Sequence, residues 1–374
     1  MYGSRSIRIR SRIFRAATLT SLLLVLSGLL SGFASAQRVH QFNIISDVPG
    51  VARTTDTQGQ LVNPWGISFS PTGPFWLSDN GSGLSTIYSG PGPITQAGLV
   101  VKVPAAAGGA TGNPTGTVFN GANAFVVTAN GVSGPAFFIF STEDGTISGW
   151  NPGADLHNAI VVVDNSKPGG VDHSELGAVY KGLAIATTKE GSFLYAANFR
   201  DRTVEIYDTN YHYVKSFRDP NVPKDYAPFG IQAIGDKIYV TFAEQDAAKH
   251  DDIRGPGHGY VDVFGPHGQL LKRLISQGPL DSPWGIALAP ANFGTFSNAL
   301  LIGNFGDGWI NAFDPVTGAP LGFLEDASHA PLVIDGLWGL AFGNGFAAGR
   351  TNELFFTAGI QGEAHGLFGK LTHF

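Results

Sequence analysis

The chain has 374 residues, of which 23 are lysine or arginine and 29 are aspartate or glutamate, giving a net charge of −6. An acidic chain is not expected to bind nucleic acid or an anionic membrane surface, because both partners require a basic protein surface. The sequence contains no cysteine, which excludes disulfide and thiolate chemistry.

Residues 1–36 have the pattern of an export signal. Five arginines between positions 5 and 15 precede an apolar run from Ala16 to Phe33, and Ala34-Ser35-Ala36 supplies small residues for cleavage. The alternative is a membrane anchor, but polar and glycine residues interrupt the run. Cleavage would leave 18 basic residues against 29 acidic ones, a charge of −11. We therefore expect an exported chain, periplasmic or extracellular, with no membrane span after removal of the signal.

From residue 64 onward, one sequence pattern recurs six times. Each copy begins with a short motif centred on glycine and continues as a strand-like run. The copies start at residues 64, 114, 180, 228, 283 and 337 and read PWGISFS, PTGTVFN, YKGLAIA, PFGIQAI, PWGIALA and LWGLAFG. Their glycines, Gly66, Gly116, Gly182, Gly230, Gly285 and Gly339, are 50, 66, 48, 55 and 54 residues apart. A second and a third strand follow in each copy, and most copies add a fourth.

Periods near fifty residues with four strands each are typical of propeller blades, which must stack around an axis to cover their faces. Glycine in the first strand is expected because the innermost backbones approach one another closely. The last copy ends after its third strand, so residues 39–45 are expected to supply its fourth strand and close the ring. The alternative is a frayed N-terminal arm. The sequence thus predicts an all-β, six-bladed β-propeller over residues 37–374.

Several long runs also resemble a known family. The runs GAVYKGLAIA, APFGIQAIGDKIYV and SPWGIALAPANFGTFSNALLIGNFGDGWINAFDP resemble an uncharacterised family of exported bacterial propeller proteins, some with a C-terminal PEP-CTERM sorting tail. The resemblance covers nearly all of the mature chain and implies export and a propeller fold, but no activity. The final residues, LFGKLTHF, depart from that tail. More distantly, the copies are similar to NHL-type repeats and to the lactonase and lyase propellers, a likeness of architecture that transfers no function.

The repeat is expected to place two rings of side chains at one mouth of the axial channel. The aromatic ring precedes the glycines, and the polar ring ends the second strands. The candidate ligand-binding residues are Trp65, Trp284, Trp338, Asn80, Asn198, Glu244 and Asn304, joined by Phe229 and by Glu143 or Asp144. Such oxygen and amide groups suit a hard cation such as Ca²⁺ or a polar sugar. Alternatively, the tryptophans pack between blades and the asparagines cap turns.

The loop from Ala243 to Gly259, AEQDAAKHDDIRGPGHG, is the clearest departure from the repeat. A loop that interrupts a repeat on its channel face is a candidate functional element. Its candidate metal ligands are Glu244, Asp246, His250, Asp251 and Asp252, although their spacing matches no zinc or EF-hand motif. The alternative is a solvated charged loop. A second insertion, over residues 164–180, brings Asp172, His173 and Glu175 to the same face.

Two classes of function fit these features. The first is a binding module that presents its channel face to a small molecule, a glycan or an envelope protein. The second is a metal-dependent hydrolase or lyase of a small lactone or sugar, with a divalent cation at the channel mouth. The sequence has no GxSxG elbow and no phosphate-binding glycine loop, so binding is the preferred interpretation.

Overall fold

The computed structural model describes residues 1, 35–90, 92–106, 111–168 and 176–373. Residues 2–34, on which nearly all of the predicted export signal falls, lie outside the described residues, as do Asp172, His173 and Glu175. The compact unit Ala34–Phe374 consists of strands, and the one helix among its described residues is the 3₁₀ helix η1 (Gly294–Phe296). No helix in the described part of the chain is long and apolar enough to cross a membrane. The all-β prediction is confirmed.

Four separate sheets have four strands each, in an antiparallel arrangement. The strands of the first set are β3 (Pro64–Ser68), β4 (Phe75–Asp79), β5 (Leu84–Ser89) and β6 (Thr95–Lys102). Those of the second are β7 (Pro114–Phe119), β10 (Phe138–Thr142), β11 (Thr146–Trp150) and β12 (Ile160–Asp164). Those of the third are β13 (Tyr180–Thr188), β14 (Gly191–Asn198), β15 (Thr203–Tyr207) and β16 (Tyr213–Phe217). Those of the fourth are β17 (Tyr226–Ile234), β18 (Lys237–Glu244), β19 (Tyr260–Phe264) and β20 (Leu270–Ser276).

The remaining principal strands form one nine-stranded sheet. Its fifth set is β21 (Pro283–Leu288), β22 (Leu300–Asn304), β23 (Ile310–Phe313) and β24 (Pro320–Glu325). Its sixth set is β25 (Leu337–Phe342), β26 (Leu354–Ile360) and β27 (His365–His373), followed by β1 (Ser35–Ser46), which also pairs with β2 (Thr54–Thr55). A small hairpin, β8 (Val126–Ala129) and β9 (Val132–Pro135), interrupts the second set and was not predicted.

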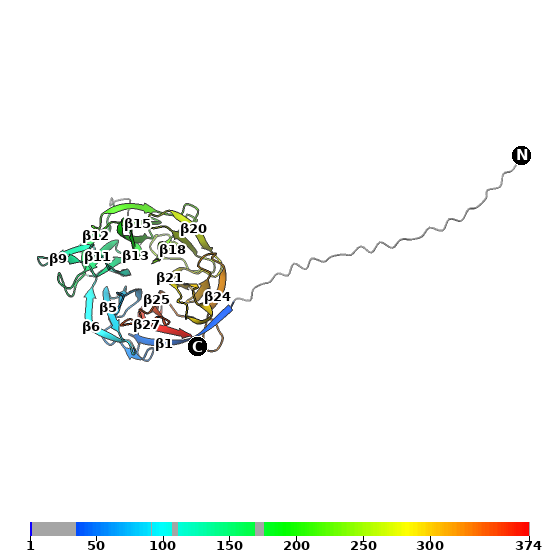
Figure 1. The fold of residues 1–374 in the computed structure, drawn as a ribbon, viewed down its shortest axis with the longest axis horizontal. Helices are drawn as coiled ribbons and strands as arrows, with labels where there is room; N and C mark the ends of the chain where they lie inside the picture. Colours follow the sequence, from blue (N-terminus) through cyan, green and yellow to red (C-terminus); the bar gives the residue numbers. More distant parts are fainter. Residues whose placement is uncertain (2–34, 91, 107–110, 169–175, 374) are drawn as a thin grey trace. The chain divides into compact units, whose positions relative to one another are not determined.

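Strand β1 joins the two ends of the chain. Its residues Val39–Ser46 pair antiparallel with β27, as predicted for the N-terminal strand, and its first four residues pair in parallel with β24. Figure 1 shows β1 beside β27, with the sets following one another around a common centre. The first strands of successive sets contact each other, and β25 contacts β3, so the inner strands form a closed circuit. The arrangement is propeller-like.

The hydrophobic core lies between neighbouring sets rather than within any one of them. Tyr195 and Ile206 of the third set, for example, pack with Val240 and Phe264 of the fourth. Comparable clusters join each of the other neighbouring pairs, including the sixth set to the first. Each sheet therefore depends on both of its neighbours to bury its apolar faces.

The glycine of each first strand lies against the next set. A Cβ atom on Gly230 would lie 2.0 Å from the carbonyl oxygen of Trp284, far inside van der Waals contact. We predict that Gly230→Ala lowers the free energy of unfolding by about 1–3 kcal/mol, because two backbones would have to separate. The matched control is Gly98→Ala in β6, where a Cβ would meet no atom within 4 Å. Equal denaturant midpoints for the two variants would contradict the steric explanation.

The pairing of β1 with β27 yields a second prediction. Deleting residues 37–46 should lower the melting temperature by several degrees, because it exposes the edge of β27 and removes the buried Val39 and Ile45, which uncovers the core clusters that they pack into. Differential scanning calorimetry of the truncated and intact proteins measures the effect. An unchanged melting temperature would show that β1 does not stabilise the unit.

Candidate functional site

The first strands all begin on one side of the circuit, and a β-bulge re-aims the side chain before the glycine. The register shifts at this position in all six first strands, β3, β7, β13, β17, β21 and β25. The residues so placed are Trp65, Thr115, Lys181, Phe229, Trp284 and Trp338. The repeat therefore delivers six side chains to one end of the channel, of which four are aromatic, one is a lysine and one is a threonine.

The aromatic side chains pack together and close this end of the channel. The ring of Trp338 stacks on Trp65 with centroids 3.6 Å apart and on Phe305 with centroids 3.8 Å apart. Trp284 meets both Trp65 and Trp338 edge to face. The ring centroid of Phe229 lies 5.7 Å from that of Trp338, and the Trp338 residue is only 1% exposed. Both faces of Trp338 are covered, so its ring is a packing element at the floor of the site.

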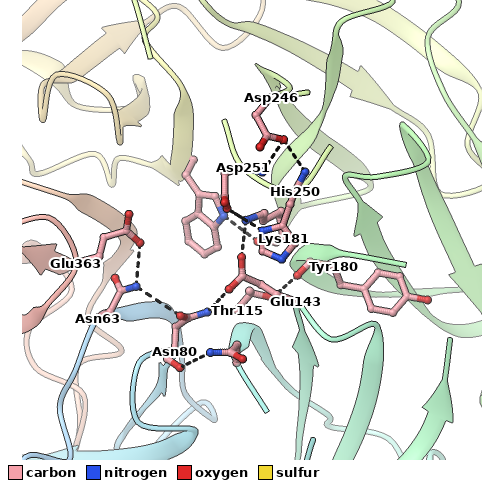
Figure 2. Close-up of polar contacts among 12 residues, drawn as sticks. Asn63, Asn80, Thr115, Glu143, Tyr180, Lys181, Asp246, His250, Asp251 and Glu363 are labelled. Atoms are coloured by element: carbon pink, nitrogen blue, oxygen red, sulfur yellow. Dashed lines mark hydrogen bonds and ion pairs between the residues drawn. The ribbon is translucent and has the colours of Figure 1, made fainter. Parts of the chain in front are cut away.

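The centre of the site is a group of four residues that we name the Lys181 cluster: Glu143, Lys181, His250 and Asp251. Figure 2 shows the Lys181 ammonium between the two carboxylates. It donates to Glu143 Oε1 and, at 3.0 Å, to Asp251 Oδ1. The Lys181 side chain is 2% exposed, whereas that of Asp251 is 66% exposed. The four residues come from β13, from the β10–β11 turn and from the loop after β18, so the cluster connects three sets of strands.

Electrostatics keep Lys181 charged despite its burial. Burial disfavours the ammonium, but the Glu143 and Asp251 carboxylates outweigh that effect and raise the pKa of Lys181. The ammonium also lies 5.1 Å from the centroid of the Trp65 ring, within the range of a cation–π contact. The His250 hydrogen bond, followed by the Lys181 charge, lowers the pKa of Asp251. The Lys181 ammonium and the Asp251 carboxylate are therefore both ionised at neutral pH.

Two asparagines extend this network across the channel. Asn80 donates from Nδ2 to Glu143 Oε2 at 2.8 Å, so both oxygens of Glu143 have partners. Asn63 donates to Glu363 Oε2 at 2.9 Å and accepts from Trp338 Nε1 at 3.0 Å. Figure 2 shows the two amides in contact with each other and with the carboxylates of Glu143 and Glu363, whose positions they fix. Through Trp338, Asn63 also connects this network to the aromatic floor.

The loop after β18 contributes two of its five predicted metal ligands to the cluster. His250 Nδ1 lies 3.0 Å from Asp251 Oδ1, and one ligand atom each of Glu143, His250 and Asp251 lie within 4.8 Å of one another. Asp246 instead accepts the backbone N–H groups of His250 and Asp251, which shapes the loop.

The other two predicted metal ligands have different partners. Glu244 pairs with His258 at 3.0 Å. Asp252 lies beside Ser282, and burial raises its pKa against the opposing effects of that hydroxyl and of Lys181. The loop therefore brings His250 and Asp251 to the Lys181 cluster and holds Glu244, Asp246 and Asp252 in other contacts.

The remaining predicted polar residues face their own sets of strands. Asn198 is buried and donates to Asp201 and Glu205, in the manner of a turn cap. Asn304 is also buried; its Nδ2 donates to the Pro279 carbonyl at 2.8 Å, while its Oδ1 has no hydrogen-bond partner among the described residues. Of the predicted polar ring, Asn80 and Glu143 thus meet at the Lys181 cluster, whereas Asn198 and Asn304 do not.

Sequence reasoning missed Lys181, Asn63 and Glu363. One signal for Lys181 was present in the repeat, because YKG replaces an aromatic residue by lysine at the position that Trp65 occupies in PWG. Asn63 and Glu363 gave no comparable signal, since single polar residues in turns are common.

No protein-family model matches the chain. It is 32% identical over 324 residues to the uncharacterised protein R648 of Acanthamoeba polyphaga mimivirus, covering 84% of this chain and 76% of R648. It is 31% identical over 322 residues to protein L690 of the same virus, covering 83% of this chain and 80% of L690. These relatives are viral and not bacterial, which corrects the bacterial kinship expected from the sequence.

Two solved structures show the level of structural similarity. Virginiamycin B lyase from Staphylococcus aureus has a TM-score of 0.48 and 12% identity, covering 90% of this chain and 99% of that one. The Pan2 WD40 domain of Neurospora crassa has a TM-score of 0.46 and 9% identity, covering 90% of this chain and 96% of that one.

Removal of the buried ammonium tests the electrostatic account of the cluster. We predict that Lys181→Met lowers the free energy of unfolding by roughly 3 kcal/mol, because it leaves the Glu143 carboxylate, whose side chain is only 12% exposed, without its cation. Adding Glu143→Gln to that variant should restore part of the loss, since no unpaired buried charge then remains. Urea unfolding of the single and double variants measures both effects.

The control for this test is Lys237→Met, at an exposed position in β18, which should change stability by less than about 0.5 kcal/mol. If the double variant were no more stable than Lys181→Met, charge burial would not be the cause of the loss.

Proposed function

We propose that this chain is an exported binding module that holds a small polar ligand at the Lys181 cluster. The chain belongs to the family that includes the mimivirus proteins R648 and L690. The observation that carries the proposal is the convergence of Glu143, Lys181, His250 and Asp251 from three sets of strands. Groups that the chain brings together from distant segments, over a packed aromatic floor, are typical of a binding site.

The scaffold in this proposal is a six-bladed propeller closed by its N-terminal strand. Six sets of strands, the closed circuit of first strands and the pairing of β1 with β27 support it. In such a scaffold the cluster lies at one mouth of the axial channel, where loops from several blades can reach a single ligand.

The charge at the mouth favours a ligand with a positively charged group. Acidic side chains outnumber basic ones there: Glu143, Asp144, Asp246, Asp251, Asp252 and Glu363 stand against Lys181 and Arg254. A mouth of one sign attracts ligands of the other. The most exposed group of the cluster is the Asp251 carboxylate, followed by His250, which is 39% exposed. A protonated amine on a sugar or a peptide matches these acceptors.

The second candidate function is the metal-dependent hydrolase or lyase. It is favoured by the approach of Glu143, His250 and Asp251, whose ligand atoms lie close enough to share a divalent ion such as Ca²⁺. However, both carboxylates already accept from the Lys181 ammonium, and a second cation would have to compete with it. A metal ion would need the Glu143 carboxylate as well, whereas a protonated amine can be held by the exposed Asp251 carboxylate while Glu143 keeps its partners Lys181 and Asn80, so the polar ligand is the preferred proposal.

Calorimetric titration with glucosamine and with N-acetylglucosamine tests the proposal. The two sugars differ in the protonated amine, so glucosamine should bind more tightly. Asp251→Asn should weaken glucosamine binding about tenfold, because it removes the charged acceptor of the amine. The control is Asp314→Asn in the exposed turn between β23 and β24, which should leave the affinity unchanged.

A parallel titration with Ca²⁺, Zn²⁺ and Mn²⁺ separates the two candidate functions. Tight binding of one ion per chain that is lost in His250→Ala would replace the preferred proposal by the metal-dependent enzyme. If neither sugar binds, or if Asp251→Asn binds glucosamine like the parent protein, the Lys181 cluster is not a site for a cationic sugar.

A further inference from the structure

A cavity lies at the other ends of the same inner strands. It has a volume of about 450 Å³ and is lined by the later residues of β3, β7, β13, β17, β21 and β25. A narrow space of about 30 Å³, lined by Gly66, Gly116 and Trp284 among others, lies along the same strands between the cavity and the aromatic floor. From Trp65 to Phe69, β3 and its extension rise by about 13 Å, so the cavity and the Lys181 cluster are separate.

The lining of this cavity is mostly apolar, its polar side chains being those of Ser68, Thr117 and Gln232, and no charged side chain belongs to it among the described residues. Ile67, Ile185 and Leu340 line its walls, and Phe69 and Phe342 are only partly buried there. Contiguous apolar surface that faces a hollow and remains in contact with water costs free energy in the empty protein. The chemistry here is therefore the opposite of that at the Lys181 cluster.

One buried polar group in this lining lacks a hydrogen-bond partner among the described residues. Thr117 lines both the cavity and the narrow space, and its hydroxyl is buried with no hydrogen-bond partner among the described residues. Thr115, two residues earlier in β7, shows the usual arrangement, since its hydroxyl donates to the Tyr180 carbonyl at 2.8 Å. A buried hydroxyl is normally satisfied, so Thr117 has an unused hydrogen-bonding capacity at the base of an apolar hollow.

We propose that this cavity is a second ligand site, which takes a neutral, largely apolar small molecule with one hydrogen-bonding group. Its volume is within the range of small-molecule pockets. A charged ligand is disfavoured, because the lining offers no ion to pair with it. The walls come from six inner strands, which are held against one another around the circuit, so the cavity is largely formed before a ligand arrives.

Fluorescence titration with the neutral probe N-phenyl-1-naphthylamine tests this site. The probe should bind once per chain, and Ala233→Trp or Ala341→Trp should each weaken it at least tenfold, because both alanines line the cavity and an indole would fill it. The two residues lie on β17 and β25, so a folding defect in one variant does not remove the test, and the melting temperature of each is recorded. Thr117→Val should weaken binding of the probe by about two- to tenfold, because it removes the hydroxyl that would meet the probe's hydrogen-bonding group.

The comparison with the other end of the channel makes the test specific. Asp251→Asn should leave binding of the naphthylamine probe unchanged, and the anionic probe 1-anilinonaphthalene-8-sulfonate should bind more weakly than the neutral one. The proposal is overturned if the neutral probe does not bind, or if it binds equally well to both tryptophan variants. It is also overturned if sedimentation shows a dimer that the probe dissociates, because the cavity would then be a contact between two copies of the chain.

Discussion

The close contact of inner backbones at the repeat glycines is the constraint on which the rest of the structure depends. A Cβ atom on any of the six glycines would lie between 2.0 and 3.0 Å from an atom of the next set of strands. The contacts run from Gly66 to Thr115, from Gly116 to Leu183 and onward until Gly339 meets Trp65. This circuit closes only if every set supplies a residue without a side chain, which explains why glycine recurs while its neighbours vary.

The same circuit separates two kinds of chemistry. Because all inner strands run in one direction, their first residues gather at one end of the channel and their last residues at the other. At the first end, the bulge turns Trp65, Lys181 and Trp338 inward, and polar loops cover them. At the other end, the later residues of the strands line a mostly apolar cavity. One structural rule thus produces two ends of the channel with different chemistry.

The sequence was sufficient for the parts of the fold that repeat. The glycine motifs located the first strands, and the unpaired strand at residues 39–45 was correctly assigned to the last set. The Lys181 cluster was beyond such reasoning, because its partners Glu143 and Asp251 are 38 and 70 residues away and meet it only when three sets stack. Whether a polar turn residue such as Asn198 or Asn80 faces its own set or the channel depends on neighbours that periodicity does not identify.

The burial of Lys181 is difficult to explain by stability alone. An ion pair removed from water gains little over a well-packed apolar pair, and the repeat offers an aromatic residue for this position in four other sets. What the lysine adds is connection, because its ammonium holds the β10–β11 turn and the loop after β18 against β13. An aromatic residue would fill the space but would leave Asp251 and its loop without that anchor. The lysine therefore fixes the positions of the exposed Asp251 and His250 groups, as the proposed binding of a ligand by these groups requires.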